Sequence, residues 1–285
     1  MKGSASISKT HCESTSHQRY HIKRAFTTAK DFKQQGYTSL RPDIGAQGLK
    51  VLKKKLEAYA TGLGVDLFGV ADLSPARDAI RVQGGQHVGE FPRAVSLGIV
   101  LVDDVVDQLH LHDDPIVIGI YRGLYTAVNA ALDRAALMVA KKIQDLGFRS
   151  YPIPASQIVN VRKLEGAFSH KLAADLAGLG WIGKSCLLIT PEHGPRVRFA
   201  TVLTDAPLEV GSPIPNRCGS CSKCVDICPV KAFTGVPFDP SEPRDVRFRA
   251  SLCDEYTEGR IQLLGDVNCG LCVHICPHGG KKRKD

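Results

Sequence analysis

Eight of the ten cysteines in this 285-residue chain lie in its final quarter, and their spacing is that of metal ligands. Residues 218–229 read Cys-x2-Cys-x2-Cys-x3-Cys-Pro, the run that holds [4Fe-4S] clusters in bacterial ferredoxins. Residues 269–277 repeat its last part, Cys-x2-Cys-x3-Cys-Pro, without the first cysteine, which Cys253 can supply. The eight thiolates are enough for two [4Fe-4S] clusters.

The ligands divide into two sets if the last cysteine of each run binds the other cluster. One set is Cys218, Cys221, Cys224 and Cys276, and the other is Cys228, Cys253, Cys269 and Cys272. A pair of zinc sites is the alternative, because Cys-x2-Cys pairs also bind zinc, but zinc ribbons seldom end twice in x3-Cys-Pro. Two adjacent clusters are typical of a conduit for single electrons, whose potentials the spacing does not fix.

The string GLGWIGKSC (residues 178–186) satisfies two phosphate-binding patterns, G-x4-G-K-[ST] and G-x-G-x2-G. Both patterns need a strand before the glycines and a helix after them. Here the order is reversed, because residues 168–179 have helical apolar spacing and residues 186–190 are strand-like. We therefore expect a helix to end at Gly178 and Gly180 with positive φ, at the wrong end of a helix for binding a phosphate.

The elements that must position these residues follow from apolar periodicity. Helical spacing predicts helices from Leu49 to Leu63, stopped by Gly64, and over residues 124–146, stopped by Gly147. Apolar runs predict strands at residues 65–70 and 94–102, the second central in a sheet. The expected fold is an α/β (α+β) domain over residues 47–210, followed by a two-[4Fe-4S] ferredoxin-like domain over residues 211–285.

The composition indicates the cellular location of the protein and the charge of its partners. Hydrophobic residues make up 43% of the chain, no apolar run is long enough to span a membrane, and the start lacks a secretory signal, so we expect a cytoplasmic protein. Residues 1–46 are predicted to be a flexible tail, with a transit peptide as the alternative, and Cys12 within them has no assigned role. The net charge of +8 favours anionic partners.

Taken together, several strings resemble the epoxyqueuosine reductase family. They are residues 172–208 (LAADLAGLGWIGKSCLLITPEHGPRVRFATVLTDAPL) and the cysteine runs, and more weakly residues 56–76 and 121–137. The resemblance implies a cobalamin that binds between the two domains and receives electrons from the clusters. It also implies a mechanism related to that of reductive dehalogenases. It also implies a modified tRNA as substrate and a low-potential electron donor of the ferredoxin or flavodoxin type. No membrane partner is expected.

The sequence departs from the family at one important place. An acidic residue that serves the family as proton donor is expected where this chain has Leu164, within VRKLEGAFSHK (residues 161–171). Substitute donors are Glu165, His170 and Tyr121, each with an ordinary structural role as the alternative. The cofactor-binding residues expected from the resemblance are Gly180, Trp181, Gly183 and Lys184. Cys186 is expected to be a buried small hydrophobe.

Two classes of function remain open from the sequence. The first is a cobalamin-dependent iron-sulfur reductase with an altered substrate site, acting on a C–O bond or, like a reductive dehalogenase, on another leaving group. The second is a ferredoxin-like electron carrier whose first domain only docks a partner enzyme. We expect the chain to lack the helical-repeat domain with which longer relatives hold tRNA, and the basic KKRKD end (residues 281–285) is a candidate for phosphate contacts.

Overall fold

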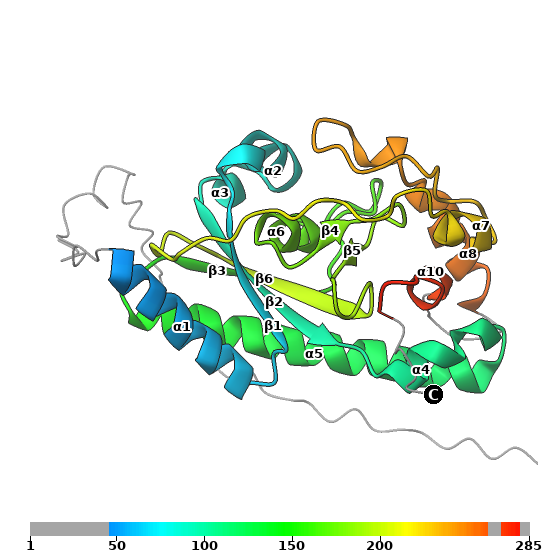
Figure 1. The fold of residues 1–285 in the computed structure, drawn as a ribbon, viewed down its shortest axis with the longest axis horizontal. Coiled ribbons are helices and arrows are strands. Elements are labelled where there is room, and N and C mark those ends of the chain that lie inside the picture. Colours follow the sequence, from blue (N-terminus) through cyan, green and yellow to red (C-terminus); the bar gives the residue numbers. More distant parts are fainter. Residues whose placement is uncertain (1–45, 262–268, 280–285) are drawn as a thin grey trace, which may run out of the picture. The chain divides into compact units, whose positions relative to one another are not determined.

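The centre of the fold is a four-stranded sheet in which every neighbouring pair of strands is antiparallel (Figure 1). The strand order is β1-β2-β6-β3, with bounds Leu67–Asp72, Arg93–Val100, Val197–Thr204 and Ser150–Ile153. The computed structural model describes residues 46–261 and 269–279. The predicted tail up to residue 45, Cys12 and the KKRKD end lie outside the described residues.

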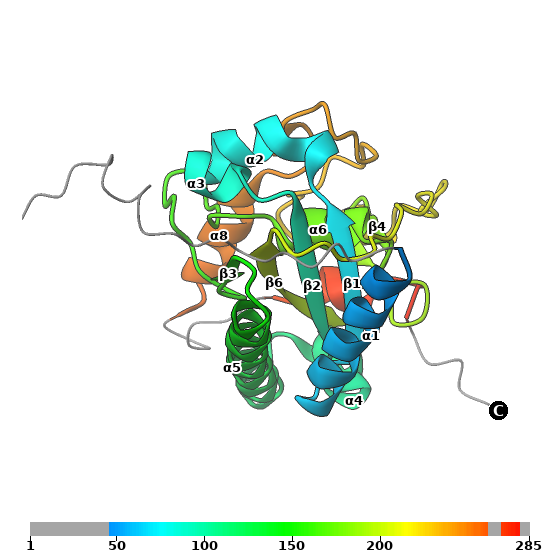
Figure 2. The same ribbon diagram turned by 90° about the vertical axis from the view of Figure 1, so that its left-hand side faces the viewer.

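Helices cover both faces of the sheet. Helices α1 (Ala46–Gly62) and α5 (Pro115–Asp145) pack on one face, and α6 (His170–Leu176) packs on the other (Figures 1 and 2). The buried face of α5 includes Leu132, Val139 and Ile143, as the helical period predicted. Further α-helices of the described residues are α2 (Arg77–Gly84), α3 (Gln86–Gly89) and α4 (Asp103–Asp107) in the first part, and α7 (Lys223–Ile227), α8 (Ala250–Glu258) and α10 (Leu271–His274) near the cysteines.

The expected α/β (α+β) class is confirmed, and the antiparallel pairing selects its α+β form. The strand predicted at residues 94–102 is β2, and it does lie inside the sheet. The predicted helix over residues 124–146 starts earlier, at Pro115. Asp114 caps it by accepting a hydrogen bond from the Ile116 backbone N–H at 2.8 Å, and Pro115 suits the first turn.

Strand β6 was missed from the sequence, although it is the strand that joins β2 to β3. Its residues, VRFATVLT, are mostly β-branched or apolar, which is the composition of a buried strand. Two shorter strands, β4 (Trp181–Ile182) and β5 (Leu188–Ile189), form a separate hairpin directly after α6. The described residues belong to one compact unit, and the proposed domain boundary near residue 210 stays a prediction.

Candidate functional site

The structure brings the cysteine side chains close together, while their division into two ligand sets stays a prediction. Cys218, Cys221, Cys224 and Cys276 line one small cavity together with Lys184 and Ser185. Burial raises the pKa of Cys276 to about 11, and the thiols of Cys218 and Cys224 contribute to this rise. An iron ion that binds one of these thiols displaces the proton of the thiol, so the ligand is a thiolate. Ligation itself stays a prediction.

The second set shows the same proximity. Burial raises the pKa of Cys253 to about 11, with further contributions from Cys269 and Cys228. The pKa of Cys272 is also raised by burial and then by Cys269, Cys253, Cys224 and Cys228. Cys228, at the end of the first run, thus lies near members of the second set, and Cys272 also lies near Cys224 of the first set. Among the described residues, no three His, Cys, Asp or Glu side chains have the arrangement that a single metal ion needs.

Residues of the GLGWIGKSC string hold the loop of the first set. The Lys184 ammonium donates hydrogen bonds to the backbone oxygens of Gly219 at 2.8 Å and Cys221 at 3.1 Å. Trp181 is 1% exposed, and its ring lies edge-on to His278, with the ring centres 5.0 Å apart. A Cβ on Gly183 would lie 3.3 Å from the Cys218 sulfur. The string therefore packs against the cysteine segment.

Glycines also decide how closely backbones approach in this region. Gly178 has a φ of 76° and closes α6, as expected, whereas Gly180 does not have positive φ. A Cβ on Gly180 would lie 2.3 Å from the backbone oxygen of Ile189, so this glycine permits the tight β4–β5 hairpin. Further along, Gly194 and Gly279 cross so closely that a Cβ on either would collide with backbone of the other segment. This crossing ties the residues after Cys276 to the turn of residues 190–194, which follows β5.

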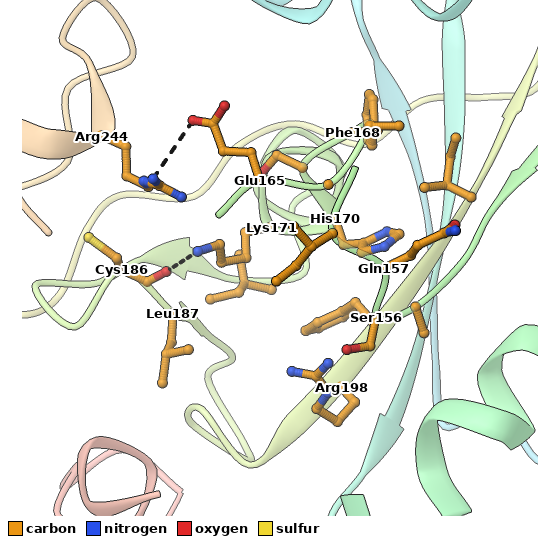
Figure 3. A pocket seen from close by; sticks show the side chains of 18 of the residues that line it. Ser156, Gln157, Glu165, Phe168, His170, Lys171, Cys186, Leu187, Arg198 and Arg244 are labelled. Carbon is orange, nitrogen blue, oxygen red and sulfur yellow. Dashed lines mark hydrogen bonds and ion pairs between the residues drawn. The ribbon is translucent and has the colours of Figure 1, made fainter. Parts of the chain in front are cut away.

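A second, much larger cavity of about 460 Å³ lies beside this region (Figure 3). Its walls come from the loop of residues 153–169, the start of α6, the turn after β4, the start of β6 and residues 238–247. Apolar walls include Phe168, Leu187 and Phe199. The volume is in the usual range for small-molecule sites.

One turn separates the two cavities. Lys184 and Ser185 line the cysteine cavity, while the next two residues, Cys186 and Leu187, line the large cavity. The turn is closed by hydrogen bonds from the Gly183 N–H to the Leu187 oxygen and from the Cys186 N–H to the Gly183 oxygen, both 2.9 Å. An iron-sulfur cluster bound by the first cysteine set would therefore lie on the other side of this turn from the large cavity.

The predicted cofactor-binding residues lie on the cysteine side of this wall. None of Gly180, Trp181, Gly183 and Lys184 lines the large cavity. Cys186 is buried as expected, but it sits in the turn with a φ of 53° and not in a strand. This residue therefore lines the large cavity and does not lie inside a sheet.

His170 lines the cavity, but both of its ring nitrogens are engaged. Nε2 donates to the Pro154 oxygen at 2.9 Å, which leaves Nδ1 to accept from the Thr201 hydroxyl at 2.7 Å. Burial lowers the pKa of His170 to about 4. This imidazole is neutral near pH 7, and its single N–H is committed to a backbone oxygen, so the geometry favours a structural role over proton donation.

The other two donor candidates occupy different places. Glu165 lines the large cavity, and its carboxylate lies 3.9 Å from the Arg244 guanidinium (Figure 3). The preceding residue, Leu164, has a φ of 52°. Tyr121 is not among the residues that line the cavity: it is 3% exposed in the core face of α5, beside Gly270. Of the three candidates, Glu165 has the best access to a molecule in the cavity.

The cavity also contains cations that the sequence did not single out. They are Lys171, Arg198, Arg244 and Arg247. The Lys171 ammonium donates to the Cys186 oxygen at 2.6 Å (Figure 3), and Arg247 is only 5% exposed, with its guanidinium 4.9 Å from the centre of the Phe238 ring. These residues come from three separate segments, α6, β6 and residues 244–247, and no local spacing connects the segments, so only the fold reveals the group.

The fold and the cysteine sets define a class: an α+β domain joined to a segment that binds iron-sulfur clusters. Residues 217–279 match the family described as a 4Fe-4S double cluster binding domain, which supports two clusters over two zinc sites. More particularly, the chain is similar to curated proteins named epoxyqueuosine reductase. It is 28% identical over 248 residues to one from Bacillus anthracis, covering 79% of this chain and 64% of the relative, and 37% identical over 122 residues to one from Gloeobacter violaceus, covering 39% and 36%.

Solved structures show the same fold. A crystal structure of epoxyqueuosine reductase with an epoxyqueuosine-modified tRNA-Tyr stem loop matches with a TM-score of 0.52 at 19% identity, covering 81% of this chain and 66% of that one. A reductive dehalogenase whose structure suggests a mechanism for B12-dependent dehalogenation matches with a TM-score of 0.60 at 19% identity, covering 84% and 33%. The chain thus spans a little under two thirds of the Bacillus anthracis relative and a third of this dehalogenase.

The lining of the large cavity combines apolar walls with cations, which is compatible with part of a corrinoid. Its apolar walls suit the faces of a flat macrocycle, and its cations suit the amide oxygens and the phosphate at the edge of cobalamin. Buried Nε atoms of Arg244 and Arg247 have no hydrogen-bond partner among the described residues. A whole cobalamin is larger than the cavity, so its binding would also use space outside these walls.

Within residues 46–261 and 269–279, none of the helices combines the length and the apolar character of a membrane-spanning segment.

Proposed function

We propose that the chain is an iron-sulfur oxidoreductase related to the epoxyqueuosine reductases, in which two [4Fe-4S] clusters deliver electrons to a substrate in the large cavity, with cobalamin as the cofactor. One observation carries the proposal. The turn of residues 183–187 lines the first cysteine cavity with Lys184 and Ser185, and the large cavity with Cys186 and Leu187. A cluster on one side is thereby separated from a substrate on the other by a single turn of chain.

The geometry suggests an order for the electrons. They enter from a low-potential donor of the ferredoxin or flavodoxin type, in the cytoplasm, pass from the cluster of Cys253 to that of Cys218, and reach the cavity across the turn. When bound, cobalamin supplies a cobalt centre that accepts single electrons and reacts with the substrate carbon. Phe168, Leu187 and Phe199 exclude water from the reacting groups, and Glu165 is the side chain that we propose as the route by which a proton reaches the departing oxygen.

The proposed reaction is reduction of a C–O bond, with a modified tRNA as the first substrate to test. Support comes from the related epoxyqueuosine reductase whose structure holds a tRNA stem loop, and from the net charge of +8, since Lys and Arg contacts to phosphates supply much of the affinity for RNA. The absence of the family's acid at Leu164 argues for a substrate site that differs from that of the relatives.

A pure electron carrier is the competing function. A carrier needs little beyond its cluster-binding segment, whereas this chain devotes its sheet and α6 to a cavity of about 460 Å³. The cavity therefore favours an enzyme.

The test begins with anaerobic expression, iron analysis and visible spectra, with and without cobalamin. We expect about eight iron atoms per chain and a bound corrinoid. A Cys218→Ser variant is expected to lose about half of the iron, while Cys186→Ser, which changes a cysteine outside both sets, keeps it. Eight irons without any corrinoid binding would favour the carrier.

The acid role has its own measurement. Glu165→Gln is expected to lower turnover by about 100-fold while leaving iron content and corrinoid binding unchanged, because general acid catalysis typically contributes 10²–10⁴-fold. His170→Gln serves as the comparison. Undiminished turnover in Glu165→Gln would remove Glu165 from the mechanism without affecting the assignment of the clusters.

A further inference from the structure

The large cavity carries an excess of positive charge. Of its described lining residues, four are cationic and only Glu165 is acidic. Two of the cations have local partners: Arg244 lies beside the Glu165 carboxylate, and Arg247 donates to the Asp239 oxygen at 3.0 Å and lies 3.7 Å from the Glu242 carboxylate. The other two, Lys171 and Arg198, have no carboxylate partner within the described part of the chain.

Lys171 enters the cavity from α6. The hydrogen bond that its ammonium makes is the one to the Cys186 backbone oxygen, at 2.6 Å, which leaves two of its three N–H groups for another acceptor. Burial lowers the pKa of Lys171; the Cys186 thiol acts against this lowering, and the charges of Arg244 and Arg198 add to it. The cations of the cavity therefore repel one another when nothing negative lies between them.

Arg198 enters from β6. Its Nε donates to the Asn129 side-chain oxygen at 3.1 Å, and its guanidinium carbon lies 4.2 Å from the centre of the Tyr125 ring. This pair of contacts fixes the plane of the guanidinium. Its two terminal nitrogens have no hydrogen-bond partner among the described residues, and they present the fork that matches two oxygens of a carboxylate or phosphate. Figure 3 shows Lys171 and Arg198 at the same cavity, reached from different elements.

We propose that Lys171 and Arg198 form an anion-binding subsite for a phosphate or carboxylate group of the substrate. The inference rests on the proposed function in taking this cavity as the substrate site. A cation removed from water is costly unless it is paired, and an anionic group between these two side chains supplies the missing partner. The reductase would thus select substrates that carry a negative charge close to the reacting atom.

The test uses the oxidised, cluster-loaded protein and inorganic pyrophosphate as the probe, with binding measured by calorimetry. Arg198→Gln and Lys171→Gln are each expected to weaken binding by about 10- to 100-fold, the usual effect of losing a hydrogen bond to a charged group. Arg122→Gln and Lys141→Gln are the matched controls, because they make the same charge changes at exposed positions of α5 outside the cavity. The controls are expected to bind like the parent.

Cobalamin also carries a phosphate, so the measurement is repeated with saturating cobalamin. Retained pyrophosphate binding supports a substrate group at the subsite, while its displacement would assign the subsite to the cofactor and overturn the substrate assignment. Absence of saturable binding, or equal losses in the α5 controls, would overturn the subsite itself. Iron content and corrinoid binding are measured on the same samples, so a failure of the proposed function is seen separately, and normal iron content shows that the variants have folded.

Discussion

Substitution of Gly180 by Ala tests how tightly the GLGWIGKSC string packs. The added Cβ would lie 2.3 Å from the Ile189 oxygen and 3.2 Å from the Thr190 Cα, and both are backbone atoms of the facing chain. Because backbone cannot swing aside as a side chain can, the hairpin must open at the pair of Trp181 and Ile189. Trp181 is almost completely buried, so the opening also disturbs its contact with His278.

The size of the effect follows from the cost of overpacking. Inserting a methyl group into a well-packed site costs about 1–3 kcal/mol, and a backbone collision belongs at the upper end, about 2–3 kcal/mol. For a folded unit of this size, each kcal/mol lowers the unfolding temperature by about 2–4 °C, so we expect a decrease of about 4–12 °C. The assay is thermal unfolding of the cluster-loaded protein under anaerobic conditions, followed by far-ultraviolet circular dichroism.

A glycine in open space provides the control. In α5, a Cβ on Gly119 would meet nothing within 4 Å, so Gly119→Ala should only improve helix propensity, by about 0.5–1 kcal/mol, and raise the unfolding temperature. If Gly180→Ala unfolds at the same temperature as the parent protein while Gly119→Ala behaves as expected, the inference that the two backbones approach closely at the hairpin is refuted.

Three further outcomes are expected. Asp114→Ala should cost about 1 kcal/mol by removing the cap of α5, seen as a lower unfolding temperature that Asp114→Asn restores. Burial lowers the pKa of His170 from 6.5 to about 4, so unfolding takes up a proton at pH values between these two. The free energy of unfolding therefore falls as the pH drops from about 6.5 toward 4. His170→Asn should flatten this part of a plot of the urea midpoint against pH. Lys184→Met removes two hydrogen bonds to the loop of the first cysteine set. A chelator should therefore bleach about half of the cluster absorbance at least ~10-fold faster than in the parent protein. Uniform bleaching at the parent rate would contradict this role of Lys184.

Features encoded over short stretches could be predicted from the sequence. The cysteine runs are local, so their chemistry was readable before the fold was known. The helix that ends at Gly178 was also predictable, because its apolar period and its glycine stop are a few residues apart. The start of α5 was missed, although Asp114 followed by Pro115 is a helix start that the sequence does contain.

The large cavity could not be predicted, because it is made by long-range packing. Lys171 comes from α6 and Arg198 from β6, which the β4–β5 hairpin separates in sequence, and Arg244 comes from beyond the first cysteine run. Nothing in the spacing of these residues brings them together. The roles expected for Trp181 and Lys184 from the family resemblance also depended on which side of the turn they face, and only the packing decides that.

The division of the cysteines into crossed sets has a consequence for how the protein survives in the cell. Each cluster would fasten thiols about 50 residues apart, as a cross-link does, and closing a loop of that length contributes about 4 kcal/mol in the chain-entropy treatment of disulfides. The close crossing of Gly194 with Gly279 would connect this cross-linked segment to the first part of the chain. Iron supply would therefore govern the stability of the protein as well as its chemistry, and a chain without its clusters is expected to be cleaved by a protease faster than the cluster-loaded chain.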